Sequence, residues 1–256
     1  MPGHKKNWKR TRGDNMSSAF IFLTGWAMNE TIWEPLLPFL PKKVHIEYLS
    51  WFHLSSVEDI DQRVEETLQK FDSVTLIAWS LGSIAALEAA SKKVGNIENM
   101  YLFSATPRFT KDSAANVSYG WSNRSVEKMR DSLTANADTV LESFHRKMFS
   151  RTDKEKHSLD SFFKQQTQRN KPLTDLKIGL DYLLEKDVRE KLHCIHVPVH
   201  IIHGKYDRII PIEAGINLAG HLPDGTFHEL ECGHLPFFSL PETSAKIITC
   251  TSEVVS

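Results

Sequence analysis

Three residues of this chain have the types and the chain order needed for nucleophilic catalysis. Ser80 lies in LIAWSLGS, Asp207 in HGKYDRIIP and His234 in ECGHLPFF. A serine hydroxyl attacks a carbonyl group efficiently only when a base takes its proton and a third group orients that base. The order Ser, Asp, His is one in which such triads occur. We therefore predict that Ser80, Asp207 and His234 form a catalytic triad.

Each of these residues also has a structural interpretation that involves no chemistry. Ser80 could cap the helix that follows it, because serine is a favoured N-cap residue. Asp207 could stabilise a turn, and His234, one of twelve histidines, could lie in a solvated loop. The catalytic interpretation is favoured because each of the three residues follows a strand-like segment.

The elements that would position the triad are short strands alternating with helices. Apolar runs rich in β-branched and aromatic residues suit strands buried on both faces. The sequence therefore predicts an α/β fold, with a mostly parallel sheet and helices on both faces. The carboxyl ends of such strands meet at the edge of the sheet where ligands bind. The predicted strands are 18–24, 44–50, 73–78, 99–105, 198–204 and the GTFHEL run before His234, and the predicted helices are 58–71, 82–92 and 211–222.

The alternation of strands and helices stops at about residue 107 and resumes after residue 192. The intervening segment has a helical pattern and is rich in charge, so we predict a helical cap, 107–192, inserted into a core formed by 17–106 and 193–256. Residues 1–16 are basic and have almost nothing to bury, which predicts a disordered arm.

One part of the predicted cap is strongly basic. The segment 144–171 carries eight basic and three acidic residues in a chain whose net charge is -1. This excess indicates either a basic binding surface or an ordinary solvated helix face, and both remain open. Arg146, Arg151 and Arg169 are the favoured anion ligands, because a guanidinium group binds phosphate through two hydrogen bonds.

The overall composition narrows the classes of partner and cofactor. A net charge of -1 with 41% apolar residues gives no global reason to bind nucleic acid or an acidic membrane surface. The three cysteines lack the spacing of a disulfide framework or a zinc site, and no apolar run approaches the roughly 20 residues of a membrane span. The sparse, odd set of cysteines fits a reducing cytoplasm. The chain has no Walker loop or GxGxxG motif, so we expect no metal and no cofactor.

Taken together, LTGW, AWSLGS, the helical insertion, HGKYDRIIP and GHLPFF resemble the α/β-hydrolase fold from about Phe20 to the C-terminus. Gly25-Trp26, the WSLG elbow at 79–82 and the cap ending GLDYLLEKDVREKL are most similar to the pimeloyl-acyl carrier protein methyl ester esterases of biotin synthesis. That resemblance implies a serine carboxylesterase that releases methanol from a carrier-bound acyl ester. By position, it implies that Ser80 is the nucleophile, His234 the general base and then acid, and Asp207 the orienting carboxylate, with the backbone N–H groups of Trp26 and Leu81 as the oxyanion hole.

The resemblance also implies a partner and a substrate site. In the family, arginines of the cap bind the acidic acyl carrier protein and its phosphopantetheine phosphate, and Arg146 and Arg151 are the corresponding candidates here. The candidates for an apolar groove that would hold the acyl chain of the ester substrate are Trp26, Trp79, Leu81 and Phe144.

The sequence departs from the family pattern at several places near the predicted site. Ala78 replaces the first glycine of the elbow, Thr24 replaces the histidine before Gly25, and YLSWFHLSS (48–56) replaces a glycine-rich loop. The edge hairpin that commonly opens the fold is expected to be missing. These differences bear on the substrate more than on the catalytic class. Two alternative functions that use the same triad are therefore a small-molecule carboxylesterase and an acyl thioesterase. A lyase, a C–C bond hydrolase and a non-catalytic binding protein are further alternatives.

Overall fold

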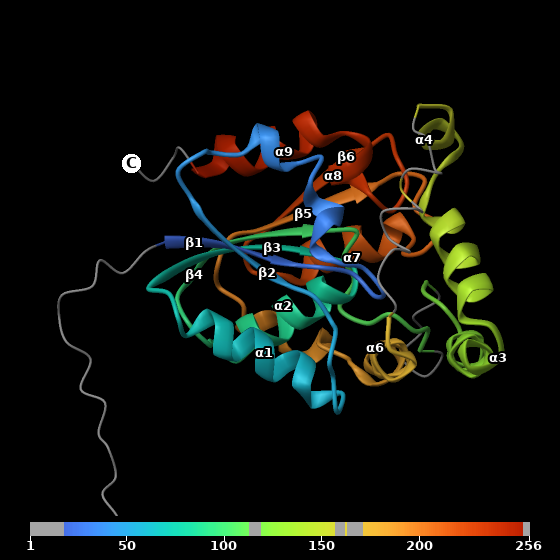
Figure 1. Ribbon diagram of the computed structural model, residues 1–256. Helices are drawn as coiled ribbons and strands as arrows, with labels where there is room; N and C mark the ends of the chain where they lie inside the picture. Colours follow the sequence, from blue (N-terminus) through green and yellow to red (C-terminus); the bar gives the residue numbers. More distant parts are fainter. Residues whose placement is uncertain (1–17, 113–118, 157–161, 163–170, 253–256) are drawn as a thin grey trace, which may run out of the picture.

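The structure is a computed structural model that describes residues 18–112, 119–156, 162 and 171–252 (Figure 1). Its strands form one six-stranded sheet in the order β2-β1-β3-β4-β5-β6, and every neighbouring pair is parallel. The predicted α/β fold with a parallel sheet is therefore confirmed. The predicted arm, 1–16, lies outside the described residues. The strands are β1 Ser18–Leu23, β2 His45–Leu49, β3 Ser73–Trp79, β4 Ile97–Phe103, β5 Val199–Gly204 and β6 Gly225–Leu230.

Helices pack on both faces of the sheet. Helices α1 and α2 lie on one side of it and α8 and α9 on the other (Figure 1). Within the described part of the chain β2 forms one edge of the sheet and β6 the other. The helical elements are η1 Glu30–Trp33, η2 Leu37–Phe39, α1 Glu58–Leu68, α2 Leu81–Ser91, α3 Asn123–Met148, α4 Arg151–Lys156, α6 Leu173–Glu185, η3 Arg189–Cys194, α7 Ile212–His221, α8 Pro236–Ser239 and α9 Pro241–Ser252.

The strand and helix around Ser80 form the centre of the core. β3 pairs with β1 on one side and β4 on the other, and its last four residues, 76–79, have no exposed surface. Helix α2 is buried along nearly its whole length, which explains why its sequence is apolar on every face rather than amphipathic. An apolar strand followed by an apolar helix therefore fixes the turn between them rigidly in the core.

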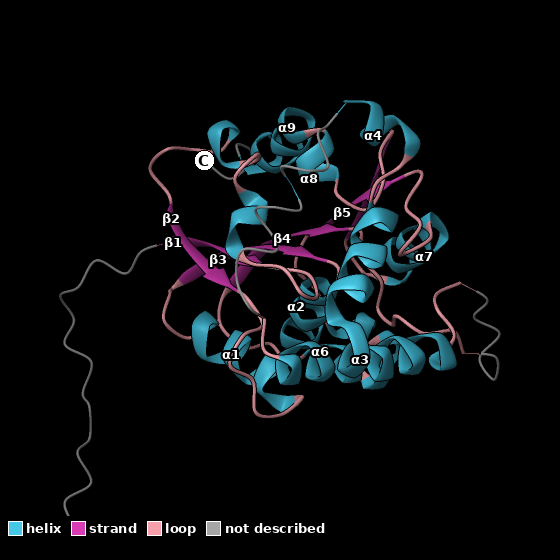
Figure 2. Ribbon diagram, turned by 45° about the vertical axis from the view of Figure 1, so that its right-hand side comes forward, coloured by secondary structure: helices cyan, strands magenta, loops and turns pink. Residues whose placement is uncertain are grey.

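The cap helices lie beyond the carboxyl ends of the strands. Helix α3 packs against α6 (Figure 2), and α3 is bent where Asn136 leaves the helical conformation, with φ -158° and ψ 81°. The Asn136 side chain accepts a hydrogen bond from the backbone N–H of Thr139 at 3.1 Å. Asn136 thus caps the second half of α3, because asparagine satisfies a free N–H at a helix start.

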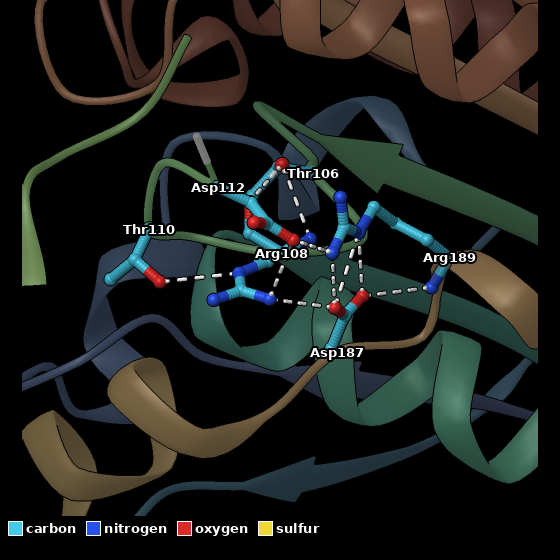
Figure 3. Close-up of polar contacts among 6 residues, drawn as sticks. All are labelled: Thr106, Arg108, Thr110, Asp112, Asp187 and Arg189. Atoms are coloured by element: carbon cyan, nitrogen blue, oxygen red, sulfur yellow. Dashed lines mark hydrogen bonds and ion pairs between the residues drawn. The ribbon is translucent and has the colours of Figure 1, made fainter. Parts of the chain in front are cut away.

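A network of ion pairs joins the two ends of the cap (Figure 3). Asp187 accepts from Arg108 at 2.9 Å and from Arg189 at 2.6 Å, and Arg189 also contacts Asp112 at 2.6 Å. Burial alone would raise the pKa of Asp187, but hydrogen bonds from Arg189 and Arg108 lower that pKa to about 2. The segments that enter and leave the cap are therefore held together, while the predicted boundaries at 107 and 192 remain predictions.

Candidate active site

Ser80 occupies the tight turn between β3 and α2. Its backbone has φ 55° and ψ -116°, a conformation that non-glycine residues rarely adopt. Gly82 makes this turn possible, because a Cβ atom there would lie 2.5 Å from the carbonyl oxygen of Leu23. Ser80 stands at the N-cap position of α2, yet its side chain makes no capping hydrogen bond. The helix-cap interpretation of Ser80 is therefore not supported, and strained turns of this kind are common at functional sites.

Asp207 and His234 form a buried pair. Asp207 follows β5 and His234 follows β6, and the Nδ1 atom of His234 lies 2.7 Å from Oδ2 of Asp207. Both side chains have no exposed surface, so His234 is not a solvated loop residue. The other oxygen of Asp207 accepts from the backbone N–H groups of Ile209 and Ile210 at 2.8 and 2.9 Å. Asp207 thus stabilises its own turn and holds the histidine as well.

The electrostatics of this pair determine which imidazole nitrogen is available. Burial by itself raises the pKa of Asp207, but the His234 charge and hydrogen bonds from His203 and His234 outweigh burial and keep the pKa below its usual range. Because a carboxylate only accepts hydrogen bonds, Nδ1 of His234 carries the proton in the neutral ring. Nε2 then has a lone pair, is buried, and has no hydrogen-bond partner among the described residues. His234 therefore has the form of a general base.

The position of His234 relative to Ser80 follows from Trp79. The Trp79 ring lies 5.3 Å from the His234 ring, and its Nε1 donates to the His234 carbonyl at 2.9 Å. Trp79 is the residue before Ser80, so the imidazole stands beside the turn that carries the serine. The structure gives no direct hydrogen bond between the Ser80 and His234 side chains, which are both described. Catalytic hydrogen bonds are often long until substrate binds.

Trp79 packs tightly within the core in this structure. Its side chain is fully buried, and a Cβ at Gly25 would lie 2.8 Å from its ring. Through its Nε1 hydrogen bond, Trp79 holds the backbone of His234 from the core side, and the expectation that Trp79 lines the substrate groove stays a prediction.

The two predicted oxyanion-hole residues flank the Ser80 turn. Leu81 is the first residue of α2, where a backbone N–H has no partner inside the helix. Trp26 follows β1 and precedes Ala27, which has a positive φ of 61°. Neither Trp26 nor Leu81 donates its backbone N–H to another residue in the described ranges. Both N–H groups thus remain available for an anionic oxygen, and their role as the oxyanion hole stays a prediction.

Trp26 and Phe144 meet where the core touches the cap. Their ring centroids are 5.0 Å apart in an edge-on contact, and Trp26 Nε1 donates to the carbonyl of Leu176 in α6 at 2.8 Å. Phe144 also lines a cavity of about 820 Å³ in the bend of α3, together with Trp121, Met129 and Val140. The structure therefore brings two of the candidate groove residues together and places a partly apolar recess next to them.

The basic residues of the cap have different surroundings. Arg146 is exposed on α3 and is paired with Glu142 one turn earlier, at 2.6 Å. Arg151 begins α4 and lines a cavity of about 480 Å³ with Tyr206 and Arg208, against the loop of Asp207. Arg169 lies outside the described residues. Of the two described candidates, Arg151 is the one that faces a recess beside the site.

Two residues that support the Asp207–His234 pair, His203 and Ser104, are not among those predicted from the sequence. His203 lies behind Asp207, with Nε2 3.4 Å from Oδ2 of Asp207 and 2.9 Å from the Ile210 carbonyl, to which it must donate. Ser104 donates its hydroxyl to the His234 carbonyl at 3.1 Å. The spacing of four between His203 and Asp207 could have indicated a contact, whereas Ser104 lies far from His234 in the sequence.

Within the described ranges, no group of three or more His, Cys, Asp or Glu side chains is arranged to hold a metal ion. In the same part of the chain, no helix is both long and apolar enough to cross a membrane. The expectations of no metal, no cofactor and no membrane partner stay predictions.

Comparisons with known proteins point to one fold family. Residues 47–241 match the family model for the alpha/beta hydrolase fold. A pimeloyl-[acyl-carrier protein] methyl ester esterase of Nitrosomonas europaea is 26% identical over 231 residues, which span 87% of this chain and 90% of the relative. Among solved structures, an esterase from Exiguobacterium antarcticum has a TM-score of 0.79 at 20% identity, covering 94% and 93% of the two chains. A bromoperoxidase from Bacillus anthracis has a TM-score of 0.82 at 15% identity, covering 93% of each.

Proposed function

The chain belongs to the α/β-hydrolase fold family and is an esterase-type hydrolase of that fold, and on this premise we propose that Ser80, His234 and Asp207 are its catalytic triad. The observation that carries the proposal is the state of His234. Its Nδ1 is held by the buried Asp207 at 2.7 Å, and its buried Nε2 is left without a partner in the described structure. A buried nitrogen with an unused lone pair is costly to keep, and a role as proton acceptor for Ser80 explains it.

The proposed reaction passes through an acyl-enzyme. Ser80 Oγ attacks the ester carbonyl carbon while Nε2 of His234 takes the serine proton, and the Asp207 carboxylate stabilises the imidazolium that forms. The negative oxygen of the tetrahedral intermediate is stabilised by the N–H groups of Trp26 and Leu81, and loss of one such donor typically costs about 2.7 to 4 kcal/mol of transition-state stabilisation. His234 then gives its proton to the leaving alkoxide, which departs as the alcohol. Water, deprotonated by His234, cleaves the acyl-enzyme and restores Ser80.

For the substrate, we propose the methyl ester of a pimeloyl chain carried by acyl carrier protein. The support is the similarity, at 26% identity, to an esterase named for that substrate, together with the basic surroundings of the site. The recess lined by Arg151 and Arg208 beside the Asp207 loop suits a phosphate or an acidic partner. The recess in the bend of α3, which Phe144 borders next to Trp26, suits an apolar chain. A cytoplasmic location is part of this proposal, in keeping with three free cysteines.

The experiment compares hydrolysis of methyl pimeloyl-acyl carrier protein with hydrolysis of a short p-nitrophenyl ester, with Ser80→Ala as the inactive control. Charge reversal by Arg151→Glu should lower kcat/KM on the carrier-bound ester at least tenfold more than on the small ester. Lys246→Glu is the matched control, because Lys246 is an exposed cation on α9 that is paired with Glu242 and lines neither of the two recesses described above. It should leave both rates unchanged.

The other candidate functions predict different results. Equal losses on the two substrates with Arg151→Glu would count against carrier recognition and favour a small-molecule carboxylesterase. Preference for a carrier-bound thioester over the methyl ester would favour a thioesterase, which uses the same acyl-enzyme. Absence of turnover on all of them would favour a non-catalytic binding protein.

A further inference from the structure

The loop that carries His234 is held between the core and the cap. On the core side, a Cβ atom at Gly204 of β5 would lie 1.9 Å from the carbonyl oxygen of Gly233. On the cap side, a Cβ at Gly233 would lie 2.4 Å from the Met148 carbonyl oxygen and 2.9 Å from Oδ2 of Asp153. A side chain at either glycine would force the layers apart. The cap segment that joins α3 to α4 thus packs directly on the backbone beside the histidine.

Two hydrogen bonds cross this contact. The backbone N–H of His234 donates to the carbonyl of Met148 at 2.7 Å, and the N–H of Gly233 donates to Oδ2 of Asp153 at 2.8 Å. The carbonyl of His234 is held from the other side by Trp79 and Ser104. The cap therefore supplies the partners of both N–H groups in the loop, while the core supplies the partners of the carbonyl.

Asp153 has one other, purely structural task. Its Oδ2 atom accepts from the N–H of Ser150 at 2.8 Å, and its own N–H donates to the Ser150 hydroxyl at 3.1 Å. This reciprocal pair is a capping box at the start of α4. The bond to Gly233 is additional to the capping box and reaches a residue 80 positions away. Asp153 is 3% exposed, and a hydrogen bond from an N–H to a buried carboxylate is stronger than one between neutral groups.

We propose that Asp153 is a positioning residue for the reaction. Through Gly233 it ties the cap to the loop of His234 and sets the place of the imidazole relative to Ser80. The cap then contributes to the chemistry of the core as well as to the binding of substrate. The inference rests on the proposed role of His234 as the base and is independent of which ester is the physiological substrate.

Three variants separate positioning from helix capping. Asp153→Ala removes the carboxylate from both the capping box and the hydrogen bond with Gly233. Asp153→Glu keeps the capping box, in which glutamate is a favoured residue at this position, but moves the carboxylate outward by one methylene and displaces it from Gly233. Ser150→Ala removes the serine half of the capping box and keeps the bond to Gly233.

The measurements are kcat and KM on a short p-nitrophenyl ester, and the exchange rate of the Gly233 amide hydrogen. Asp153→Ala and Asp153→Glu should lower kcat by about 10- to 100-fold, because a misplacement of about 1 Å has effects of this size. KM should stay within about twofold, and the Gly233 amide should exchange faster. Ser150→Ala should keep kcat within about threefold of the wild type. If Asp153→Ala does not fold, Asp153→Glu still gives the decisive comparison.

Two results would overturn the inference. Wild-type kcat and wild-type Gly233 exchange in Asp153→Glu would show that Asp153 acts on helix α4 alone. An equal loss of kcat in Ser150→Ala and Asp153→Ala would assign the effect to the capping box. Failure of the proposed function would give another result. The wild type would then hydrolyse no more ester than Ser80→Ala, which would contradict both the catalytic triad and the positioning role of Asp153.

Discussion

Gly82 allows α2 to begin against the end of β1, and Gly82→Ala should lower activity far more than it lowers stability. A Cβ at this position would lie 2.5 Å from the Leu23 carbonyl oxygen and 2.6 Å from that of Thr24. Ordinary contact begins at 3.4 Å, so the start of α2 must retreat by about 0.9 Å, and both obstacles are backbone atoms of β1 and of the residue that follows it. The retreat would displace Ser80 and the N–H of Leu81 together.

Two opposed contributions set the expected change in the free energy of unfolding. Overpacking in a core costs about 1 to 3 kcal/mol, and alanine is about 1 kcal/mol better than glycine within a helix. The free energy of unfolding should therefore fall by about 0 to 2 kcal/mol. A displacement near 1 Å should lower kcat by about 100-fold. Urea unfolding monitored by fluorescence gives the first quantity, and turnover of a p-nitrophenyl ester gives the second.

Gly220→Ala is the matched control. Gly220 also lies in a helix, α7, but a Cβ there meets no atom within 4 Å. The same substitution should raise the free energy of unfolding by about 0.5 to 1 kcal/mol and leave turnover unchanged. If Gly82→Ala retained kcat within twofold of the wild type, the close packing at the start of α2 would not be what positions Ser80, and the reasoning would be refuted.

Three further substitutions test other parts of the site and the cap. Asp207→Asn should lower kcat by about 10⁴-fold, since the amide no longer fixes the required His234 tautomer; a loss below tenfold would argue against the triad. Trp79→Phe should destabilise the protein by about 1 kcal/mol and lower kcat a few-fold, because one of the two donors to the His234 carbonyl is lost; an unchanged kcat would contradict its positioning role. Asp187→Asn should cost about 1 kcal/mol at pH 7, after allowance for partial exposure. The folded pKa of Asp187 is lowered to about 2, so this stabilisation is present above pH 4 and lost as the pH falls toward 2. Parallel stability curves for the wild type and Asp187→Asn in acid would contradict this assignment.

The sequence was sufficient for the parts of the site that depend on local patterns. Apolar runs without polar alternation predicted the parallel strands. The inner strands are mostly buried as expected, whereas the edge strands β2 and β6 are partly exposed. Placement after strands brought Ser80, Asp207 and His234 into one region. For Ser80 the structure adds two observations that the sequence does not contain. Its φ is positive and its side chain makes no capping hydrogen bond, so Ser80 lies in a constrained turn rather than at an ordinary helix start.

The parts that depend on long-range packing had no signal in the sequence. An aromatic residue beside a serine has the same local pattern whether its ring faces a ligand or the core, so Trp79 could not be assigned from sequence. The bend in α3 occurs at one residue, Asn136, within a long helical pattern. Charge counting missed that Arg146 is already paired with Glu142, although their spacing of four residues could have indicated it. The contact of Asp153 with Gly233 joins segments 80 residues apart, beyond any local pattern.

The central claim is that Ser80 is a nucleophile activated by His234. The most direct measurement is intact mass spectrometry after reaction with a small fluorophosphonate, followed by peptide mapping. We expect one adduct per chain, located on Ser80, which is absent in Ser80→Ala and forms about 100-fold more slowly in His234→Ala. An adduct of the wild type on another residue, or labelling of Ser80→Ala at the wild-type rate, would contradict the central claim.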